Sequence, residues 1–288
     1  MAVTLATDVT LRSGIAMPIF GLGTFLCTEG DCEKAVLQAL RNGVRLIDTA
    51  QYYENEEAVG AAIDRFCADT GSAKPFVVTK LRWDAHGAEN VRPMLMGSLK
   101  KLRLSHVDLF LMHSPEGGRC VETWREMLTL RNEGFARAVG VSNFGVEHLE
   151  GLRAAGLEAP EVNQIELHPW LQQRDVVEYM LSHQIAVMGY CPLARAKKFG
   201  EEGSPVASIA ASKGISEAVV CIRWSLERGF ITIPKSASQE RIQENISAAS
   251  LGRTLFDAES MEIIAKADCG FCASLAVRSM WKPWGPFK

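Results

Sequence analysis

Short apolar runs rich in β-branched residues alternate with longer amphipathic stretches along most of the chain. An uninterrupted apolar run is typical of a strand buried on both faces, whereas a 3.6-residue period is typical of a surface helix. The pattern predicts eight strand–helix units. The strands are expected at 19–23, 44–48, 76–80, 107–113, 136–141, 162–167, 185–190 and 230–234, and the helices at 32–41, 54–66, 91–102, 120–131, 146–155, 175–182, 205–212 with 216–227, and 239–249.

Eight such units in succession predict an α/β fold of the (β/α)8 TIM-barrel type, a barrel that needs about 250 residues. A doubly wound sheet is the alternative, but it would need a domain break, and no Pro/Gly/Ser-rich linker or shift in composition interrupts the chain. We therefore expect a single domain over 1–288. Residues 9–11 and 16–18 flank Ser13-Gly14 and predict a β-hairpin that plugs the bottom of the barrel. A C-terminal tail follows residue 268, and its proline-rich run 281–286 does not favour a helix.

The composition is that of an ordinary globular protein, with 47% hydrophobic and 23% charged residues among 288. The net charge of -3 does not favour a nucleic-acid-binding face. No apolar run approaches the roughly 18 residues of a membrane span, and the N-terminus does not resemble a signal peptide. Eight scattered cysteines fit reduced thiols better than a disulfide framework, so a cytoplasmic location is expected.

One cysteine pair, Cys269 and Cys272, has CxxC spacing. Such a pair can be redox-active or half of a zinc site. No further His or Cys lies nearby in sequence, and the pair follows a helical stretch rather than a strand. Two tail thiols without such a role are the favoured interpretation, and no metal is expected.

Polar and reactive groups follow the apolar runs, one after another. In a TIM barrel the C-terminal ends of the strands share one rim, where active sites lie. A single polar residue at a strand end is unremarkable, but seven positions that converge on one rim predict a site. These are Asp48, Lys80, His113, Ser142-Asn143, Gln164, Tyr190 and Lys235-Ser236.

Four of the residues near this rim make a chemically sensible set for proton transfer. Tyr53 lies five residues beyond Asp48, and a nearby Lys80 ammonium would lower its pKa by favouring the phenolate. Asp48 would hold Lys80, and a neutral His113 would orient a carbonyl. A structural Asp–Lys ion pair beside a packed tyrosine is the alternative, and Tyr52 is the competing phenol.

The cofactor side has no Rossmann fingerprint, because the glycine pattern in 21–26 fails at its last position. Instead, Lys235, Ser236 and Arg241 surround a predicted helix start and suit a phosphate, which favours NADPH over NADH. Tyr190 would stack on the nicotinamide. The carboxamide would find donors and acceptors among Ser142, Asn143 and Gln164.

Seven segments, in this order and spacing, closely resemble the aldo-keto reductases, and the resemblance covers roughly residues 5 to 267. They are 21–25, 48–56, 78–81, 108–113, 140–144, 162–166 and 233–236. The likeness extends to short microbial and protist reductases of the prostaglandin F synthase type. It implies NADPH-dependent reduction of aldehydes and ketones to alcohols by a monomeric barrel that binds cofactor first.

The resemblance also assigns residues. It places the catalytic tetrad on Asp48, Tyr53, Lys80 and His113. The implied cofactor contacts are Gly23, Thr24, Asp48, Ser142, Asn143, Gln164, Tyr190, Pro192, Leu193, Lys235, Ser236, Arg241, Glu244 and Asn245. The implied substrate contacts are Phe25, Tyr53, Trp83, His113 and Ser114.

This chain departs from the family pattern around the substrate. Phe25 and Ser114 each stand where the family usually has tryptophan, which predicts a wider pocket. The loop after Leu193 carries Arg195 and Lys197, which either contact a phosphate or are solvated.

Two other function classes remain open from the sequence. A Schiff-base aldolase would use Lys80 as its nucleophile, but that leaves Tyr190, Asn143 and the Lys235–Arg241 phosphate site without a purpose. A non-catalytic NADPH-binding or structural relative is the second alternative, and the intact tetrad argues against it.

Overall fold

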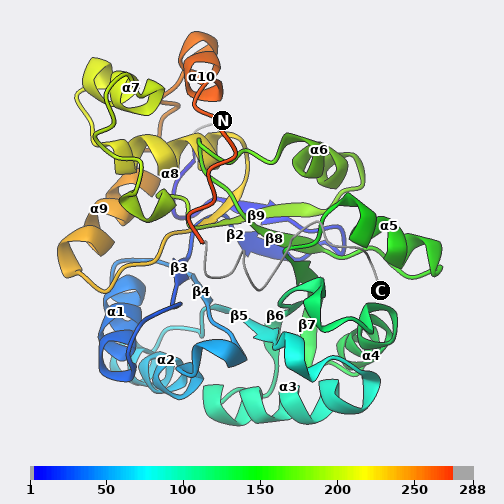
Figure 1. The fold of residues 1–288 in the computed structure, drawn as a ribbon. Helices are drawn as coiled ribbons and strands as arrows, with labels where there is room; N and C mark the ends of the chain where they lie inside the picture. Colours follow the sequence, from blue (N-terminus) through cyan, green and yellow to red (C-terminus); the bar gives the residue numbers. More distant parts are fainter. Residues whose placement is uncertain (1–2, 275–288) are drawn as a thin grey trace.

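The apolar runs form one eight-stranded parallel sheet in the computed structural model, which describes residues 3–274. The strands are β3 (Leu22–Gly23), β4 (Leu46–Asp48), β5 (Phe76–Leu81), β6 (Val107–Met112), β7 (Ala136–Ser142), β8 (Val162–Glu166), β9 (Ala186–Tyr190) and β10 (Ile231–Ile233). They lie in chain order, and parallel bridges from Phe20 to Thr232 and from Gly23 to Lys235 join the last strand to the first. The predicted TIM barrel is therefore confirmed (Figure 1).

Helices surround this barrel on the outside (Figure 1). They are α1 (Glu29–Arg41), α2 (Glu56–Thr70), α3 (Ala88–Leu102), α4 (Cys120–Asn132), α5 (Val146–Ala154), α6 (Arg174–Ser182), α7 (Pro205–Lys213), α8 (Glu217–Glu227), α9 (Gln239–Ala249) and α10 (Ala258–Ala265). Several begin at a side-chain cap: the hydroxyl oxygens of Ser216 and Ser238 accept hydrogen bonds from backbone N–H groups in the first turn.

No single helix in 3–274 is long and apolar enough to cross a membrane, although α7 and α8, bent by 99° at their junction, meet that length and composition together.

Two apolar clusters hold the barrel together. One fills its interior and includes Leu46, Val78, Leu109 and Leu111. The larger one lies between the strands and the helices. Alternate residues of β5 and β6 supply the two clusters, so these strands are apolar on both faces. Each buried aliphatic side chain contributes about 1.5–3 kcal/mol.

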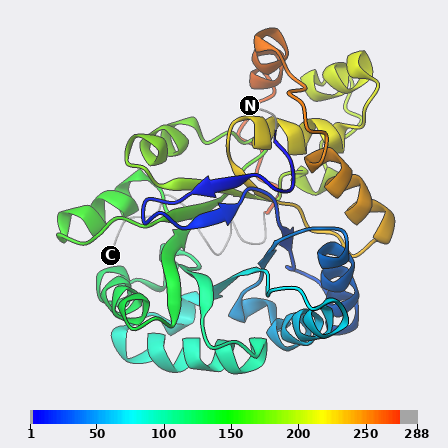
Figure 2. The ribbon, with the colours of Figure 1, turned by 180° about the vertical axis from the view of Figure 1, so that it is seen from behind.

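A hairpin of β1 (Asp8–Thr10) and β2 (Ala16–Pro18) covers one end of the barrel, as predicted. Leu11 and Met17 from this hairpin belong to the interior cluster. Figure 2 shows the hairpin lying across the barrel from behind. The opposite end, where the strands terminate, remains available for a site.

The last described segment follows α10 and runs toward the middle of this second end, in red in Figure 1. The proline-rich run predicted at 281–286 lies outside the described residues.

Candidate active site

A cavity of about 560 Å³ opens at the C-terminal ends of the strands. Its lining includes Tyr53 and His113 together with Lys235 and Arg241. Most of the residues predicted for the site line it: Gly23, Phe25, Asp48, Tyr53, His113, Ser142, Asn143, Gln164, Tyr190, Pro192, Leu193, Lys235, Ser236, Arg241, Glu244 and Asn245.

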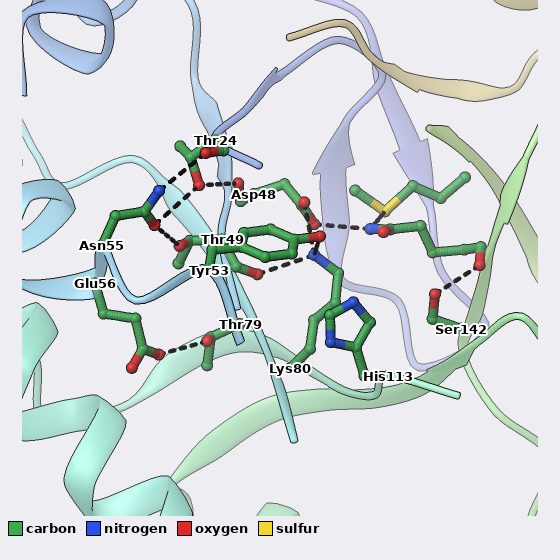
Figure 3. Close-up of polar contacts among 12 residues, drawn as sticks. Thr24, Asp48, Thr49, Tyr53, Asn55, Glu56, Thr79, Lys80, His113 and Ser142 are labelled. Carbon is green, nitrogen blue, oxygen red and sulfur yellow. Dashed lines mark hydrogen bonds and ion pairs between the residues drawn. The ribbon is translucent and has the colours of Figure 1, made fainter. Parts of the chain in front are cut away.

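The Lys80 ammonium is the centre of the polar network around Tyr53 (Figure 3). Its Nζ donates to Asp48 Oδ1 at 2.7 Å, to the Thr49 carbonyl at 2.9 Å and to the Tyr53 hydroxyl oxygen at 3.1 Å. The side chains of Lys80 and Asp48 are fully buried or nearly so. The network therefore uses all three Nζ protons and ties the phenol to an ion pair.

A short turn places Tyr53 against Lys80. After β4 the backbone forms a 3-10 turn, Gln51–Tyr53, and Glu54 then adopts a left-handed conformation at φ 55°. This is why α2 begins at Glu56 and not at 54 as predicted. The buried Asn55 holds the turn, since its Nδ2 donates to the Thr24 carbonyl at 2.9 Å and its Oδ1 accepts from Thr49 Oγ1 at 2.9 Å.

The pKa of Tyr53 differs from the prediction. Burial raises it well above its ordinary value, and the Asp48 carboxylate and the Cys191 thiol raise it further. The Lys80 ammonium favours the phenolate, but Asp48 balances its charge at 2.7 Å, so burial prevails. The phenol is thus protonated at neutral pH, the state that a proton donor requires.

Burial and mutual attraction oppose each other in the Asp48–Lys80 pair. Burial raises the pKa of Asp48 and lowers that of Lys80, while the attraction between the two charges counters both effects. Gln164 also stabilises the carboxylate, because its Nε2 donates to Asp48 Oδ2 at 2.7 Å. Sequence reasoning placed Gln164 only beside a carboxamide and missed this link.

His113 faces Tyr53 across the cavity, with ring centroids 5.5 Å apart and an interplanar angle of 74°. Burial lowers its pKa well below the ordinary value, and the positive charge of Lys80 adds to the effect. A neutral imidazole at pH 7 follows, in line with the sequence expectation.

The residues predicted for the carboxamide form a connected group on one wall. Asn143 Nδ2 donates to the His113 carbonyl at 3.0 Å, and the Tyr190 hydroxyl donates to Asn143 Oδ1 at 2.9 Å. Ser142 Oγ donates to the Gln164 carbonyl at 2.8 Å. Asn143 has a positive φ of 60°, a conformation that asparagine tolerates better than most residues.

The part of the cavity lining that follows β10 is cationic. Lys235 and Ser236 follow β10, and Arg241 lies in the first turn of α9. The Ser236 hydroxyl accepts from the Ser238 N–H at 3.1 Å and fixes the turn between them. Neither Lys235 nor Arg241 has a carboxylate partner within residues 3–274. Glu244, which also lines the cavity, accepts from Ser216 Oγ at 2.6 Å.

Three predicted contacts do not line the cavity. The Thr24 hydroxyl is buried and donates to the Asp48 carbonyl at 3.0 Å, so it supports the active-site turn instead of facing a cofactor. Ser114 is fully buried and caps a 3-10 turn by accepting from the Glu116 N–H at 3.3 Å. Trp83 lies behind Tyr52, with ring centroids 4.5 Å apart. Of the two residues that stand in place of the family's tryptophans, Phe25 lines the cavity and Ser114 does not.

Sequence reasoning also missed the role of Glu166 at the end of β8. Its carboxylate accepts from the Ala273 N–H at 2.5 Å, the Ser274 N–H at 3.2 Å and the Cys272 thiol at 3.1 Å. Burial alone would raise its pKa, but hydrogen bonds, chiefly from His168, hold the pKa below its usual value. Glu166 thereby anchors the last described segment, whose Ser274 lines the cavity. The sequence signal for this role was a charged residue, Glu166, within a run predicted to be a buried strand.

The CxxC pair lies on this anchored segment. Cys269 is exposed, and Cys272 is half-buried against Glu166. No group of three or more His, Cys, Asp or Glu side chains in the described part of the chain is arranged to hold a metal ion.

Comparison with known proteins matches residues 20–268 to the aldo/keto reductase family. The methylglyoxal reductase DkgA of Escherichia coli K12 is 37% identical over 266 residues, which cover 92% of this chain and 94% of that protein. The uncharacterized oxidoreductase YtbE of Bacillus subtilis is 37% identical over 267 residues, which cover 92% of this chain and 95% of YtbE.

A solved structure agrees. The Bombyx mori aldo-keto reductase AKR2E4, crystallised in complex with NADP, superposes with a TM-score of 0.87 at 30% identity and covers 99% of both chains. The family match, these relatives and the barrel with its rim of polar strand ends lead to one conclusion: the chain belongs to the aldo/keto reductase family of oxidoreductases.

Proposed function

We propose that this chain reduces aldehydes and ketones to alcohols with NADPH, and that Tyr53 donates the proton. One observation carries the proposal: Tyr53, whose hydroxyl lies 3.1 Å from Lys80 Nζ, lines the same cavity as Lys235 and Arg241. A proton donor and a phosphate site thus share one continuous space. Methylglyoxal, after which the E. coli relative is named, belongs in the first substrate panel.

The cavity suits the cofactor. Its volume of about 560 Å³ lies within the range of small-molecule sites. Lys235 and Arg241, which have no carboxylate partner within residues 3–274, are suited to a phosphate, and Tyr190 lines the same cavity. A bound dihydronicotinamide supplies the hydride that the reduction requires.

The chain's own residues position and protonate the carbonyl. His113 is neutral, so its ring can donate a hydrogen bond to the carbonyl oxygen without carrying a charge. The Tyr53 phenol then transfers its proton to that oxygen. The Lys80 ammonium stabilises the phenolate left behind, and Asp48 keeps Lys80 in place.

The aldolase alternative does not fit the geometry. A Schiff base needs an unprotonated amine that reaches the substrate. Lys80 instead donates its three Nζ protons to Asp48, Thr49 and Tyr53. Its side chain is fully buried and does not line the cavity. Borohydride treatment with a ketone and without nucleotide is therefore expected to leave Lys80 unmodified.

The direct test is the near-ultraviolet absorbance of NADPH during incubation with methylglyoxal, 4-nitrobenzaldehyde, phenylglyoxal and 9,10-phenanthrenequinone. We expect oxidation of NADPH with at least one of them. NADPH binding without turnover of any would favour the non-catalytic alternative.

Arg241→Ala is expected to raise the Kd of NADPH by about 10- to 100-fold and to leave the Kd of NADH nearly unchanged, because the lost hydrogen bonds are charge-assisted and directed to the extra phosphate. Fluorescence titration measures both constants. Arg65→Ala, which removes a cation outside the cavity, is the control. Equal changes for the two nucleotides would refute the phosphate-site assignment.

The pH dependence of kcat/KM follows from the two shifted groups. His113 has a pKa below its ordinary value and stays neutral, and Tyr53 has a pKa above its ordinary value and stays protonated. We expect no change in kcat/KM between about pH 6 and about pH 8, since neither group titrates there. Initial rates in buffers of constant ionic strength test this. A loss of activity centred near pH 6.5 would show that His113 titrates normally.

A further inference from the structure

Glu56, at the start of α2, is a buried acid that the proposed reaction does not use. It is 2% exposed and does not line the cavity. A carboxylate with so little access to water is costly unless neighbouring groups stabilise it. Two other buried acids have clear roles, since Asp48 pairs with Lys80 and Glu166 anchors the last described segment. The neighbours of Glu56 therefore indicate what it does.

Glu56 lies behind the strand that carries Lys80. Thr79, the residue before Lys80 in β5, donates from Oγ1 to Glu56 Oε1 at 2.6 Å (Figure 3). Successive side chains of a strand point to opposite faces. Lys80 thus extends into the barrel toward Tyr53, while Thr79 faces the helices and meets Glu56. The strand lies between the carboxylate and the ammonium.

The same carboxylate is linked to the turn that carries Tyr53. The Ser98 hydroxyl, from α3, stabilises Glu56 by a hydrogen bond and accepts from Gln51 Nε2 at 3.0 Å. Gln51 is the first residue of the 3-10 turn that ends at Tyr53. Its Oε1 accepts from the N–H of Arg82, the residue that follows β5, at 3.1 Å. Glu56 therefore belongs to the polar layer that supports the active-site turn from outside.

Glu56 is surrounded by groups that stabilise its ionised form. Burial raises the pKa of Glu56, whereas hydrogen bonds from Thr79 and Ser98 and the ammonium groups of Lys101 and Lys80 oppose that rise. Thr79 and Lys80 belong to β5, and Ser98 and Lys101 belong to α3, so both elements packed against the carboxyl supply donors or positive charge. We therefore expect Glu56 to be ionised at neutral pH.

Two carboxylates thus act on the buried Lys80 ammonium. Burial lowers the pKa of Lys80, and Asp48 and Glu56 both oppose that shift, Asp48 more strongly. Asp48 lines the cavity and Glu56 does not, so Glu56 acts from a place that no substrate reaches. The other titratable groups that face the Tyr53 phenol are Asp48, His113 and Cys191.

We propose that Glu56 is a positioning residue of the reaction: its carboxylate is a second counter-charge, behind β5, that keeps the Lys80 ammonium and the Tyr53 phenol protonated. The inference rests on the proposed function and extends it to a residue that touches neither substrate nor cofactor. A nearby negative charge stabilises an ammonium and disfavours a phenolate. Removal of the Glu56 charge therefore makes a proton easier to remove from either group.

Glu56→Gln tests this, because it keeps the size of the side chain and removes its charge. We expect the alkaline loss of kcat/KM for carbonyl reduction to move to lower pH by about one unit, the order of effect of one charge at an intermediate effective dielectric. The Kd of NADPH at pH 7 should stay the same. Glu56→Asp keeps the charge and should titrate close to the unchanged protein.

Glu161→Gln is the matched control. Glu161 is also 2% exposed, and it accepts a hydrogen bond at 3.2 Å from the N–H of Ser13 in the hairpin. The same substitution there removes a buried carboxylate at the opposite end of the barrel. We expect the alkaline loss of kcat/KM to stay where it is in the unchanged protein.

An NMR titration separates this inference from the proposed function. The chain has four tyrosines, so the signals of tyrosine labelled with 13C at Cζ are few, and the one missing in Tyr53→Phe belongs to Tyr53. We expect Glu56→Gln to move the ionisation of Tyr53 to lower pH, as in the rate profile. If no carbonyl compound is reduced, the proposed function fails, yet a displaced NMR titration still supports the role of Glu56.

The double variant Glu56→Met with Thr79→Val serves if Glu56→Gln does not fold. It replaces both partners of the hydrogen bond by apolar groups, leaves neither unpaired, and should show the same displacement. A lower kcat without displacement of either titration would make Glu56 a packing residue and overturn the inference. Equal displacement in Glu56→Asp or in Glu161→Gln would do so as well, because the Glu56 charge would then not be its cause.

Discussion

Replacing Tyr53 with phenylalanine is expected to lower kcat by about 100- to 10,000-fold, the range over which a positioned acid accelerates proton transfer. The Kd of NADPH should stay nearly unchanged, because the phenol acts on the substrate oxygen. Lys80 would keep its bonds to Asp48 and the Thr49 carbonyl, so the ion pair survives the change. NADPH oxidation and fluorescence titration measure the two quantities on the same preparation.

Tyr52→Phe is the matched control for this experiment. Tyr52 also lines the cavity, but its ring packs on Trp83 and not on Lys80. We expect this variant to keep most of its turnover. Comparable losses in the two variants, or a parallel loss of NADPH affinity in Tyr53→Phe, would remove Tyr53 from the role of proton donor.

Asp48→Asn is expected to lower the free energy of unfolding by about 3–5 kcal/mol, because it leaves the buried Lys80 charge without a counter-charge. The side chains of Lys80 and Asp48 are 0% and 3% exposed, so water cannot compensate. Urea denaturation followed by fluorescence gives the free energy. The double variant Asp48→Asn with Lys80→Met should be more stable than Asp48→Asn alone, since it removes the stranded charge.

The exposed pair of Arg92 and Glu133, joined at 2.6 Å, provides the comparison. Arg92→Met should shift the denaturation midpoint little, because solvent screens such pairs. If Asp48→Asn were equally mild, the Asp48–Lys80 contact would not be a buried ion pair in solution.

The strands and the rim of the barrel were predictable because a strand that is buried on both faces is a continuous apolar run in the sequence. The run 107–112, for instance, is apolar except for Asp108 and corresponds to β6, which His113 follows directly. Parallel strands end on one side of the barrel, so polar residues that follow them must converge. Asp48, Lys80 and His113 meet for this topological reason, without any need to know side-chain angles.

Side-chain direction was not predictable in the same way. Thr24 and Ser114 follow strands, as the cavity residues do, but local partners turn both away: the Asp48 carbonyl binds one, and the Glu116 N–H binds the other. The direction of the Tyr53 pKa shift depended on burial, which sequence spacing does not report. Arg195 contacts Phe25 because its backbone is left-handed, and an arginine between two alanines gives no sequence signal for that conformation.

The anchor at Glu166 has a consequence for how this protein can diversify. Two of its bonds go to main-chain N–H groups, those of Ala273 and Ser274, and every residue except proline carries such a group. The attachment of this segment to Glu166 therefore depends little on which side chains positions 273 and 274 carry. Position 274, which forms part of the cavity wall, can exchange one side chain for another while the wall stays fastened to β8. Substitutions at this position can thus change the substrate preference while the fold stays the same.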